Sequence, residues 1–211
     1  MYFMQIKAFR EPKSERIINT ITTEEIASLK SLNLESKSLE NVRKWILIGV
    51  SIGQRISDLI EVTKENIRVN KDGYLMIDIV QKKTGSEVSP VIADKEIIDQ
   101  VYPDLPYKIS EQKFNKYMKM VCKEASIDKM VKGYKMNNKT KRKELVNLPK
   151  YEMLSSHDLR RSFATNYFDK VPTSILMNLT GHTKESTFLE YIGKSQDKDY
   201  YADAFIKAIQ S

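Results

Sequence analysis

The segment 156–191 constrains the fold more than any other part of the chain. It holds both histidines of the sequence, His157 and His182. Apolar residues three and four places apart predict a helix at its start, and a proline and Gly181 bracket a second helix. His182 follows Gly181 directly, and a third short helix is expected to carry Tyr191 near its end. Any fold for this chain must therefore pack three short consecutive helices.

The polar residues of this segment form a cation-rich set with two imidazoles and a phenol. His157 and Arg160 are three places apart, so they share one face of the predicted helix. Arginine offers a planar fork of donors that fits phosphate, and histidine can bind phosphate or move a proton near neutral pH. Tyr191 offers an oxygen nucleophile that needs a base or a positive field, because a free phenol has a pKa of about 10. Each residue alone also fits a capping or core role, but the combination is harder to explain by such roles.

Three motifs carry a resemblance to a known family. His157-x-x-Arg160, then Gly181-His182, then Tyr191 nine residues after His182 resemble the pattern of the tyrosine recombinase (phage integrase) family. Upstream, Gly53-x-Arg55-x-x-Asp58-Leu59 resembles the first-arginine motif of that family. Alone the arginine motif is weak, and its ordinary reading is a surface charge at a helix start. The resemblance covers about residues 20–193.

The family also has a lysine on a β-hairpin, and the sequence offers two candidates. Residues 66–91 read as short strands, with turn signals at Asp72-Gly73 and at Thr84-Gly85. Lys82 and Lys83 fall at the second turn, where the ordinary reading is a solvated basic loop. The resemblance favours Lys83, because it precedes Thr84-Gly85 and so matches the Lys-Thr-Gly form that is common in the family. Neighbouring strand residues point to opposite faces, so both lysines are not expected to reach the site.

The resemblance implies a fold and a reaction. The fold would be α+β, mainly α-helical with a small antiparallel sheet. The reaction would be metal-free and cofactor-free DNA cleavage and rejoining through a 3′-phosphotyrosine. Arg55, Arg160 and His182 would hold the scissile phosphate. Lys83 would protonate the leaving 5′-oxygen, His157 would accept the phenol proton, and Tyr191 would be the nucleophile.

Charge and composition fit a nucleic-acid partner. The chain carries a formal net charge of +7, from 35 Lys and Arg against 28 Asp and Glu, which favours a polyanion such as double-stranded DNA.

A single cysteine excludes a disulfide framework, and no apolar run is long enough to span a membrane, so a cytoplasmic protein is expected. The residues expected to contact DNA are basic side chains near the site, on a helix over 110–125 and in the basic segment 129–150: Lys82, Lys113, Lys116, Lys119, Lys139, Lys141, Arg142, Lys143 and Arg161.

The predicted organisation has three parts. Residues 1–20 read as a linker or entering segment, 21–193 as the catalytic domain, and 194–211 as a tail helix with an apolar stripe that docks on its own domain or on a neighbouring protomer. The resemblance implies a monomer that assembles as a tetramer on DNA. It also implies that a DNA-gripping helical domain outside these residues contributes to full activity.

Two other functions remain open at this level. A type IB topoisomerase shares the fold and the chemistry but relaxes DNA without exchanging partners. A non-catalytic DNA-binding module would use the same residues only to hold phosphate. The sequence leaves open the target DNA, the use as integrase or resolvase, and the accessory proteins.

Overall fold

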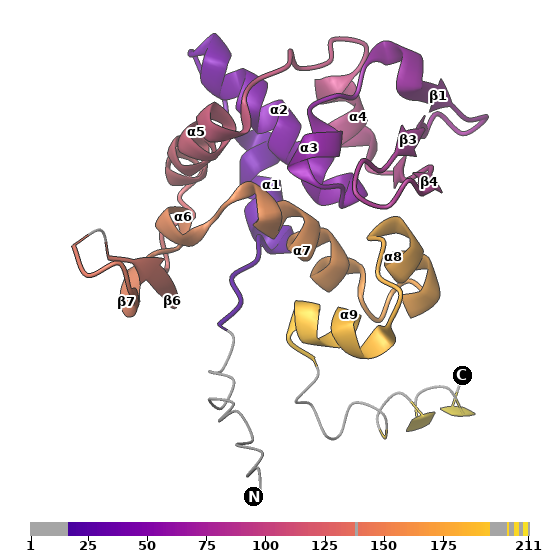
Figure 1. The fold of residues 1–211 in the computed structure, drawn as a ribbon. Helices are drawn as coiled ribbons and strands as arrows, with labels where there is room; N and C mark the ends of the chain where they lie inside the picture. The colour runs from indigo at the N-terminus through magenta and orange to yellow at the C-terminus, as the bar shows by residue number, and fades with distance from the viewer. Residues whose placement is uncertain (1–16, 138, 195–201, 203–204, 207–208, 211) are drawn as a thin grey trace, which may run out of the picture.

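The computed structural model describes residues 17–137, 139–194, 202, 205–206 and 209–210, and helices are its main secondary structure (Figure 1). The helices are α1 (Thr23–Ser31), α2 (Lys37–Ile52), α3 (Ile56–Leu59), η1 (Lys64–Asn66), α4 (Lys95–Val101), α5 (Glu111–Glu124), α6 (Lys150–Met153), α7 (Ser156–Tyr167), α8 (Thr173–Leu179) and α9 (Glu185–Ile192). The strands are β1 (Ile67–Val69), β2 (Leu75–Ile77), β3 (Ile79–Val80), β4 (Glu87–Val88), β5 (Val91–Ile92), β6 (Met130–Met136) and β7 (Lys143–Pro149). The predicted α+β class with small antiparallel sheets is confirmed.

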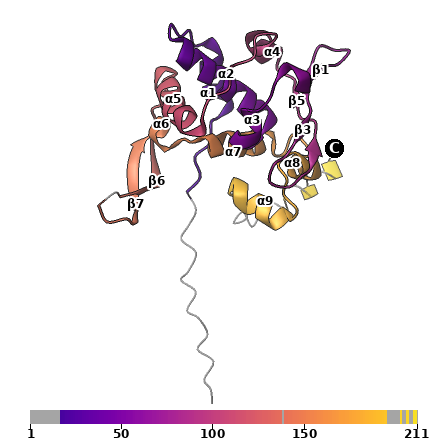
Figure 2. The ribbon, with the colours of Figure 1, turned by 45° about the horizontal axis from the view of Figure 1, so that its top comes forward.

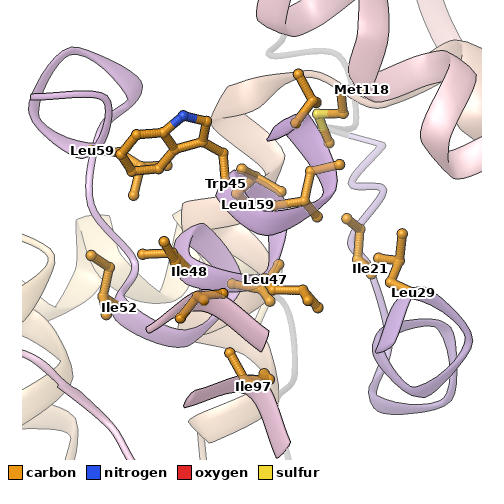
Figure 3. Packing of buried hydrophobic residues seen from close by; sticks show 14 of the residues in the cluster. Ile21, Leu29, Trp45, Leu47, Ile48, Ile52, Leu59, Ile97, Met118 and Leu159 are labelled. Carbon is orange, nitrogen blue, oxygen red and sulfur yellow. The ribbon is translucent and has the colours of Figure 1, made fainter. Parts of the chain in front are cut away.

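Helix α2 is the centre of the larger core. Its residues from Asn41 to Ile52 are buried apart from Lys44, and α4, α5 and α7 pack against it. Trp45 is fully buried in this core (Figure 3). Its indole nitrogen donates to the Tyr107 carbonyl oxygen at 3.0 Å. A helix that is apolar on nearly all sides is stable only when other elements surround it. Helices α3 and α7, which position Arg55, His157 and Arg160, both pack against α2.

The start of α1 and the end of α2 each coincide with a clear sequence signal. Thr22 and Glu25 form a capping box at the start of α1, with reciprocal bonds of 3.3 and 2.8 Å. Gly53 ends α2 in the left-handed conformation, at φ 64°, and its N–H donates to the Gly49 carbonyl oxygen. Helix α3 begins at Ile56, three residues after Gly53.

Two small antiparallel sheets follow α3. One is three-stranded in the order β1-β2-β5, and the other pairs β3 with β4 through Ile79↔Val88 and Val80↔Glu87. The predicted hairpins are confirmed, but β3 ends at Val80. Lys82 and Lys83 therefore lie in the turn itself, where the alternation of strand side chains does not apply.

The basic segment 129–150, which the sequence predicts as either a β-ribbon or an ordered insertion, forms the two strands β6 and β7. They pair from Met130↔Pro149 to Met136↔Lys143. The ribbon projects from the helical body on the side away from β1 and β3 in both views (Figures 1 and 2). Its length and position leave most of its side chains exposed.

Helices α7, α8 and α9 share a second, smaller apolar cluster. Its buried members include Phe163, Leu176 and Phe188. The apolar pattern of α8 predicts that Ile175 faces the core, but the structure leaves Ile175 49 % exposed. A buried hydroxyl, Ser162, receives the N–H of Ile21 at 2.8 Å, which ties the described start of the chain to α7.

Two predicted segments fall largely outside the described residues. The entering segment 1–20 is described only from residue 17, and the tail helix 194–211 lacks residues 195–201, 203–204, 207–208 and 211. Both assignments stay predictions.

Candidate active site

Arg55 lies at the N-terminal end of α3, directly after the turn made by Gly53. It is half-buried, and its Nη1 is a buried atom with no hydrogen-bond partner among the described residues. Asp58, one turn further on, is 4 % exposed and has one buried oxygen, Oδ2, that is likewise without a partner there. Its Oδ1 accepts from the backbone N–H of Lys82 at 3.2 Å. A buried, unpaired guanidinium nitrogen gains a large interaction when an anionic oxygen reaches it.

Arg160 projects from α7 towards the same turn. It is 3 % exposed, and its Nη1 donates to the Gly53 carbonyl oxygen at 3.1 Å. Burial, and next to it the positive charge of Arg55, lowers the pKa of Arg160 to about 10. Arg160 is still charged at neutral pH, so two mutually repelling guanidinium groups are held together. An anion between them would relieve that repulsion.

His157 and the capping of α7 lie one turn before Arg160. Ser155 and Asp158 form a capping box, and Asp158 also accepts from Arg161 Nη1 at 3.1 Å. His157 is exposed, and its ring meets that of Tyr191 edge to face, with the centroids 5.4 Å apart. The start of α7 thus places an accessible imidazole beside the phenol.

His182 follows Gly181, whose left-handed backbone (φ 58°) ends α8. Its Nδ1 lies 2.8 Å from the Thr180 hydroxyl oxygen, and that hydroxyl donates to the Leu176 carbonyl oxygen at 2.5 Å. A hydroxyl has one hydrogen, so this bond assigns the proton of neutral His182 to Nδ1 and leaves Nε2 as an acceptor. Burial, followed by the charges of Arg160 and Arg55, lowers the pKa of His182 to about 4.

Tyr191 lies at the end of α9 and is 8 % exposed, with a buried hydroxyl that has no hydrogen-bond partner among the described residues. Its ring centroid is 4.9 Å from that of His182 and 4.9 Å from Arg161 Cζ. Burial raises the pKa of Tyr191, while Arg160 and Arg161 act in the opposite direction. The phenol is neutral at neutral pH, and its oxygen is available for a new partner.

The two candidate lysines differ in their contacts. Lys82 Nζ pairs with Glu61 at 3.1 Å, whereas Lys83 is exposed and forms no ion pair with any described residue. Both lie in one loop beside Asp58. The geometry leaves Lys83 free to turn towards a phosphate, and its role stays a prediction.

The predicted DNA-contacting residues divide into exposed side chains and side chains that other residues of the protein hold in place. Lys113 and Lys116 on α5, and the ribbon-tip residues Lys139, Lys141, Arg142 and Lys143, are exposed. Lys119 is half-buried and donates to the Glu152 carbonyl oxygen at 2.8 Å. Arg161 is held by Asp158 and by the carbonyl oxygen of Tyr191, to which its Nε donates at 3.1 Å. Each of these contacts with DNA also stays a prediction.

Sequence reasoning missed two buried glutamines, Gln54 and Gln81, that are 1 % and 0 % exposed. They stand immediately before Arg55 and before the lysine pair. Their positions beside two motifs were the only available signal, because nothing in the local pattern says that a glutamine is buried.

Within the described part of the chain, no group of three or more His, Cys, Asp or Glu side chains is arranged to hold a metal ion. The helices seen there are too short or too polar for any of them to cross a membrane.

By its fold, this protein belongs to the class of the tyrosine recombinase catalytic domains. Residues 7–198 match the phage integrase family, and the chain belongs to that family. No curated protein matches the chain by sequence.

Several solved structures share the fold. One is XerH site-specific recombinase bound to a palindromic difH substrate after cleavage, with a TM-score of 0.61 and 16 % identity over 93 % of this chain and 56 % of that one. A lambda integrase dimer bound to a COC′ core site has a TM-score of 0.59 and 20 % identity over 90 % and 64 % of the two chains. The Tn1549 transposon integrase with circular intermediate DNA has a TM-score of 0.52 and 15 % identity over 94 % and 67 %. This chain spans between about half and two thirds of these chains.

Proposed function

We propose that this chain is the catalytic part of a site-specific DNA recombinase or integrase whose nucleophile is Tyr191. The observation that supports this proposal most is that polar side-chain groups without hydrogen-bond partners lie buried together at the candidate site. The Tyr191 hydroxyl and Arg55 Nη1 are both buried and without partners among the described residues. Arg160 and two imidazoles stand around the phenol. A tetrahedral phosphate would supply partners for all these groups.

The proposed cleavage step balances as a transesterification. The Tyr191 oxygen attacks the scissile phosphorus and loses its proton to His157, the accessible imidazole beside it. The bond from phosphorus to the 5′-oxygen breaks, and Lys83 gives that oxygen a proton. The product is a 3′-phosphotyrosine and a free 5′-hydroxyl, and a second 5′-hydroxyl reverses the step on a new strand.

The two arginines stabilise the charge that develops on the phosphate. Arg160 is held by the Gly53 carbonyl oxygen and Arg55 is half-buried before the substrate arrives, so both charges already lie at the site. His182 presents an acceptor at Nε2 when neutral. It therefore donates to a phosphate oxygen only after it takes up a proton, which the phosphate charge favours.

The proposed partner is double-stranded DNA, on which several copies of this protein would assemble. XerH and lambda integrase are DNA-bound in the solved structures, and lambda integrase also forms a tetramer on a Holliday junction. The net charge of +7 and the projecting basic ribbon support the same arrangement here. The ribbon would contact the duplex beside the site.

The test is the covalent intermediate. The full chain is incubated with a library of nicked duplexes whose core is randomised, and protein-linked DNA is recovered under denaturing conditions and sequenced. We expect an adduct at Tyr191 with a defined core sequence. Absence of any adduct would indicate a binding module. Supercoil relaxation without strand exchange between two duplexes would indicate a topoisomerase.

A further inference from the structure

Gln54 and Gln81 form a buried amide pair beneath the candidate site. Gln81 Nε2 donates to Gln54 Oε1 at 2.8 Å and to the Leu179 carbonyl oxygen at 3.0 Å. Gln54 Nε2 donates to the same Leu179 oxygen at 2.9 Å and to the Ile52 carbonyl oxygen at 3.1 Å. All four amide hydrogens of the pair are therefore used.

The remaining oxygen of the pair reaches the lysine loop. Gln81 Oε1 accepts from the Thr84 hydroxyl at 2.9 Å. The backbone of Gln81 closes the same loop, because its carbonyl oxygen accepts from Gly85 N at 2.8 Å and its N–H donates to the Ser86 carbonyl oxygen at 2.9 Å. Lys82 and Lys83 thus lie in a loop in which Thr84, Gly85 and Ser86 are all hydrogen-bonded to Gln81.

The pair also joins the other two parts of the site. Gln54 is the residue before Arg55, and Leu179 lies three residues before His182. The packing there is close: a Cβ on Gly181 would lie 2.7 Å from Gln81 Oε1. One buried network therefore contacts the segments that carry the first arginine, the lysine loop and the second histidine.

We propose that Gln81, with Gln54 as its partner, is a positioning residue that fixes the lysine loop relative to Arg55 and His182. This rests on the proposed function, in which a lysine of that loop protonates the leaving oxygen. Fully satisfied buried networks specify one geometry, since any shift would leave a polar atom unpaired without water to replace it. The amides act through the lysine and do not touch the phosphate.

The first measurement is a single-turnover cleavage rate on two DNAs. One is the duplex selected by the adduct experiment, and the other carries sulfur in place of the bridging 5′-oxygen. A thiolate leaves without a proton donor, so sulfur bypasses a misplaced lysine. We expect Gln81→Leu to lose about 10²-fold on the oxygen substrate, the usual effect of a misplacement near 1 Å, and to recover to near the unsubstituted rate on sulfur. A merely structural defect would reduce both rates.

Two further variants sharpen the assignment. Thr84→Val keeps the shape of the loop, removes only the hydroxyl link and should give a smaller loss with the same sulfur rescue. It also serves if Gln81→Leu does not fold. The matched control is Gln100→Leu, which removes a glutamine bonded to Arg43 at 2.6 Å outside the site and should leave both rates unchanged.

The second measurement needs no cleavage. Hydrogen exchange of the free chain should show faster exchange in Gln81→Leu for the amides of residues 82–85, with α2 and α5 unchanged. Unchanged exchange in the loop would overturn the inference, as would equal losses on the oxygen and sulfur substrates. If the unsubstituted chain forms no adduct at all, the proposed function fails, and the exchange data still decide whether Gln81 holds the loop.

Discussion

The guanidinium of Arg161 lies over the ring of Tyr191, with Cζ 4.9 Å from the ring centroid, while its Nε donates to the carbonyl oxygen of the same residue at 3.1 Å. Asp158 holds the other side of this guanidinium at 3.1 Å. One α7 side chain thus fixes both the ring and the backbone at the end of α9. The candidate nucleophile is placed by contacts within its own chain.

Tyr191→Phe should abolish the covalent adduct and leave the fold intact. The lost hydroxyl is buried without a partner among the described residues, so the unfolding free energy should stay the same or rise by up to about 1 kcal/mol. Urea denaturation and a denaturing gel with nicked DNA measure the two effects. An adduct that persists in the Phe variant would remove Tyr191 as the nucleophile.

Lys83→Ala should lose cleavage of ordinary DNA and regain it when sulfur replaces the bridging 5′-oxygen. Lys82→Ala should keep most of its activity, because Lys82 is engaged with Glu61 at 3.1 Å. Single-turnover rates on both substrates give the answer. Rescue by sulfur in Lys82→Ala, without rescue in Lys83→Ala, would exchange the two roles.

His182 should stay neutral in the free protein well below its ordinary titration range. Its folded-state pKa of about 4 lies below the usual 6.5, so the unfolded state binds the proton more tightly. His182 therefore costs stability as the pH falls from 6.5 towards 4, and its effect vanishes above that window. Nitrogen NMR of the imidazole should show the proton on Nδ1. His182→Gln should make the unfolding free energy less sensitive to pH in this range, and an unchanged sensitivity would contradict the assignment.

Charge reversal at the ribbon tip should flatten the salt dependence of DNA binding. Each phosphate that the protein neutralises adds about −0.9 to the slope of log affinity against log salt. Replacing Lys139, Lys141, Arg142 and Lys143 with Glu should reduce the magnitude of the slope by about 0.9 for every phosphate that is no longer neutralised. Lys71→Glu, at the exposed β1–β2 turn, is the control and should leave the slope as it is. Equal slopes in all variants would exclude the tip as a DNA-binding surface.

Gly53→Ala should destabilise the fold far more than Gly73→Ala. Both glycines have a left-handed backbone, at φ 64° and 82°, which costs any other residue about 1 kcal/mol. A Cβ at Gly53 would also overlap the ring of Phe163, whereas nothing lies within 4 Å at Gly73. We expect losses of about 2–4 kcal/mol at Gly53 and about 1 kcal/mol at Gly73 by urea denaturation. Comparable losses at the two positions would show that the Phe163 ring yields easily.

Local structure could be predicted from the sequence. The capping box of Thr22, the stop at Gly53 and the apolar stripe of α5 act within one or two helical turns, so their signals are complete in the sequence. The same holds for the basic ribbon and for the spacing that places Tyr191 on a short helix after His182. The family resemblance came from these local motifs.

The partners of each site residue depend instead on tertiary packing. Gln81 meets Gln54 across 27 positions and Leu179 across 98, and no local pattern encodes a partner at such distances. The exposure of Ile175 and the engagement of Arg161 by Tyr191 depend likewise on how α7, α8 and α9 pack. Burial then sets the direction in which the pKa values of Arg160, His182 and Tyr191 move, because it is the packed chain that removes water from around them.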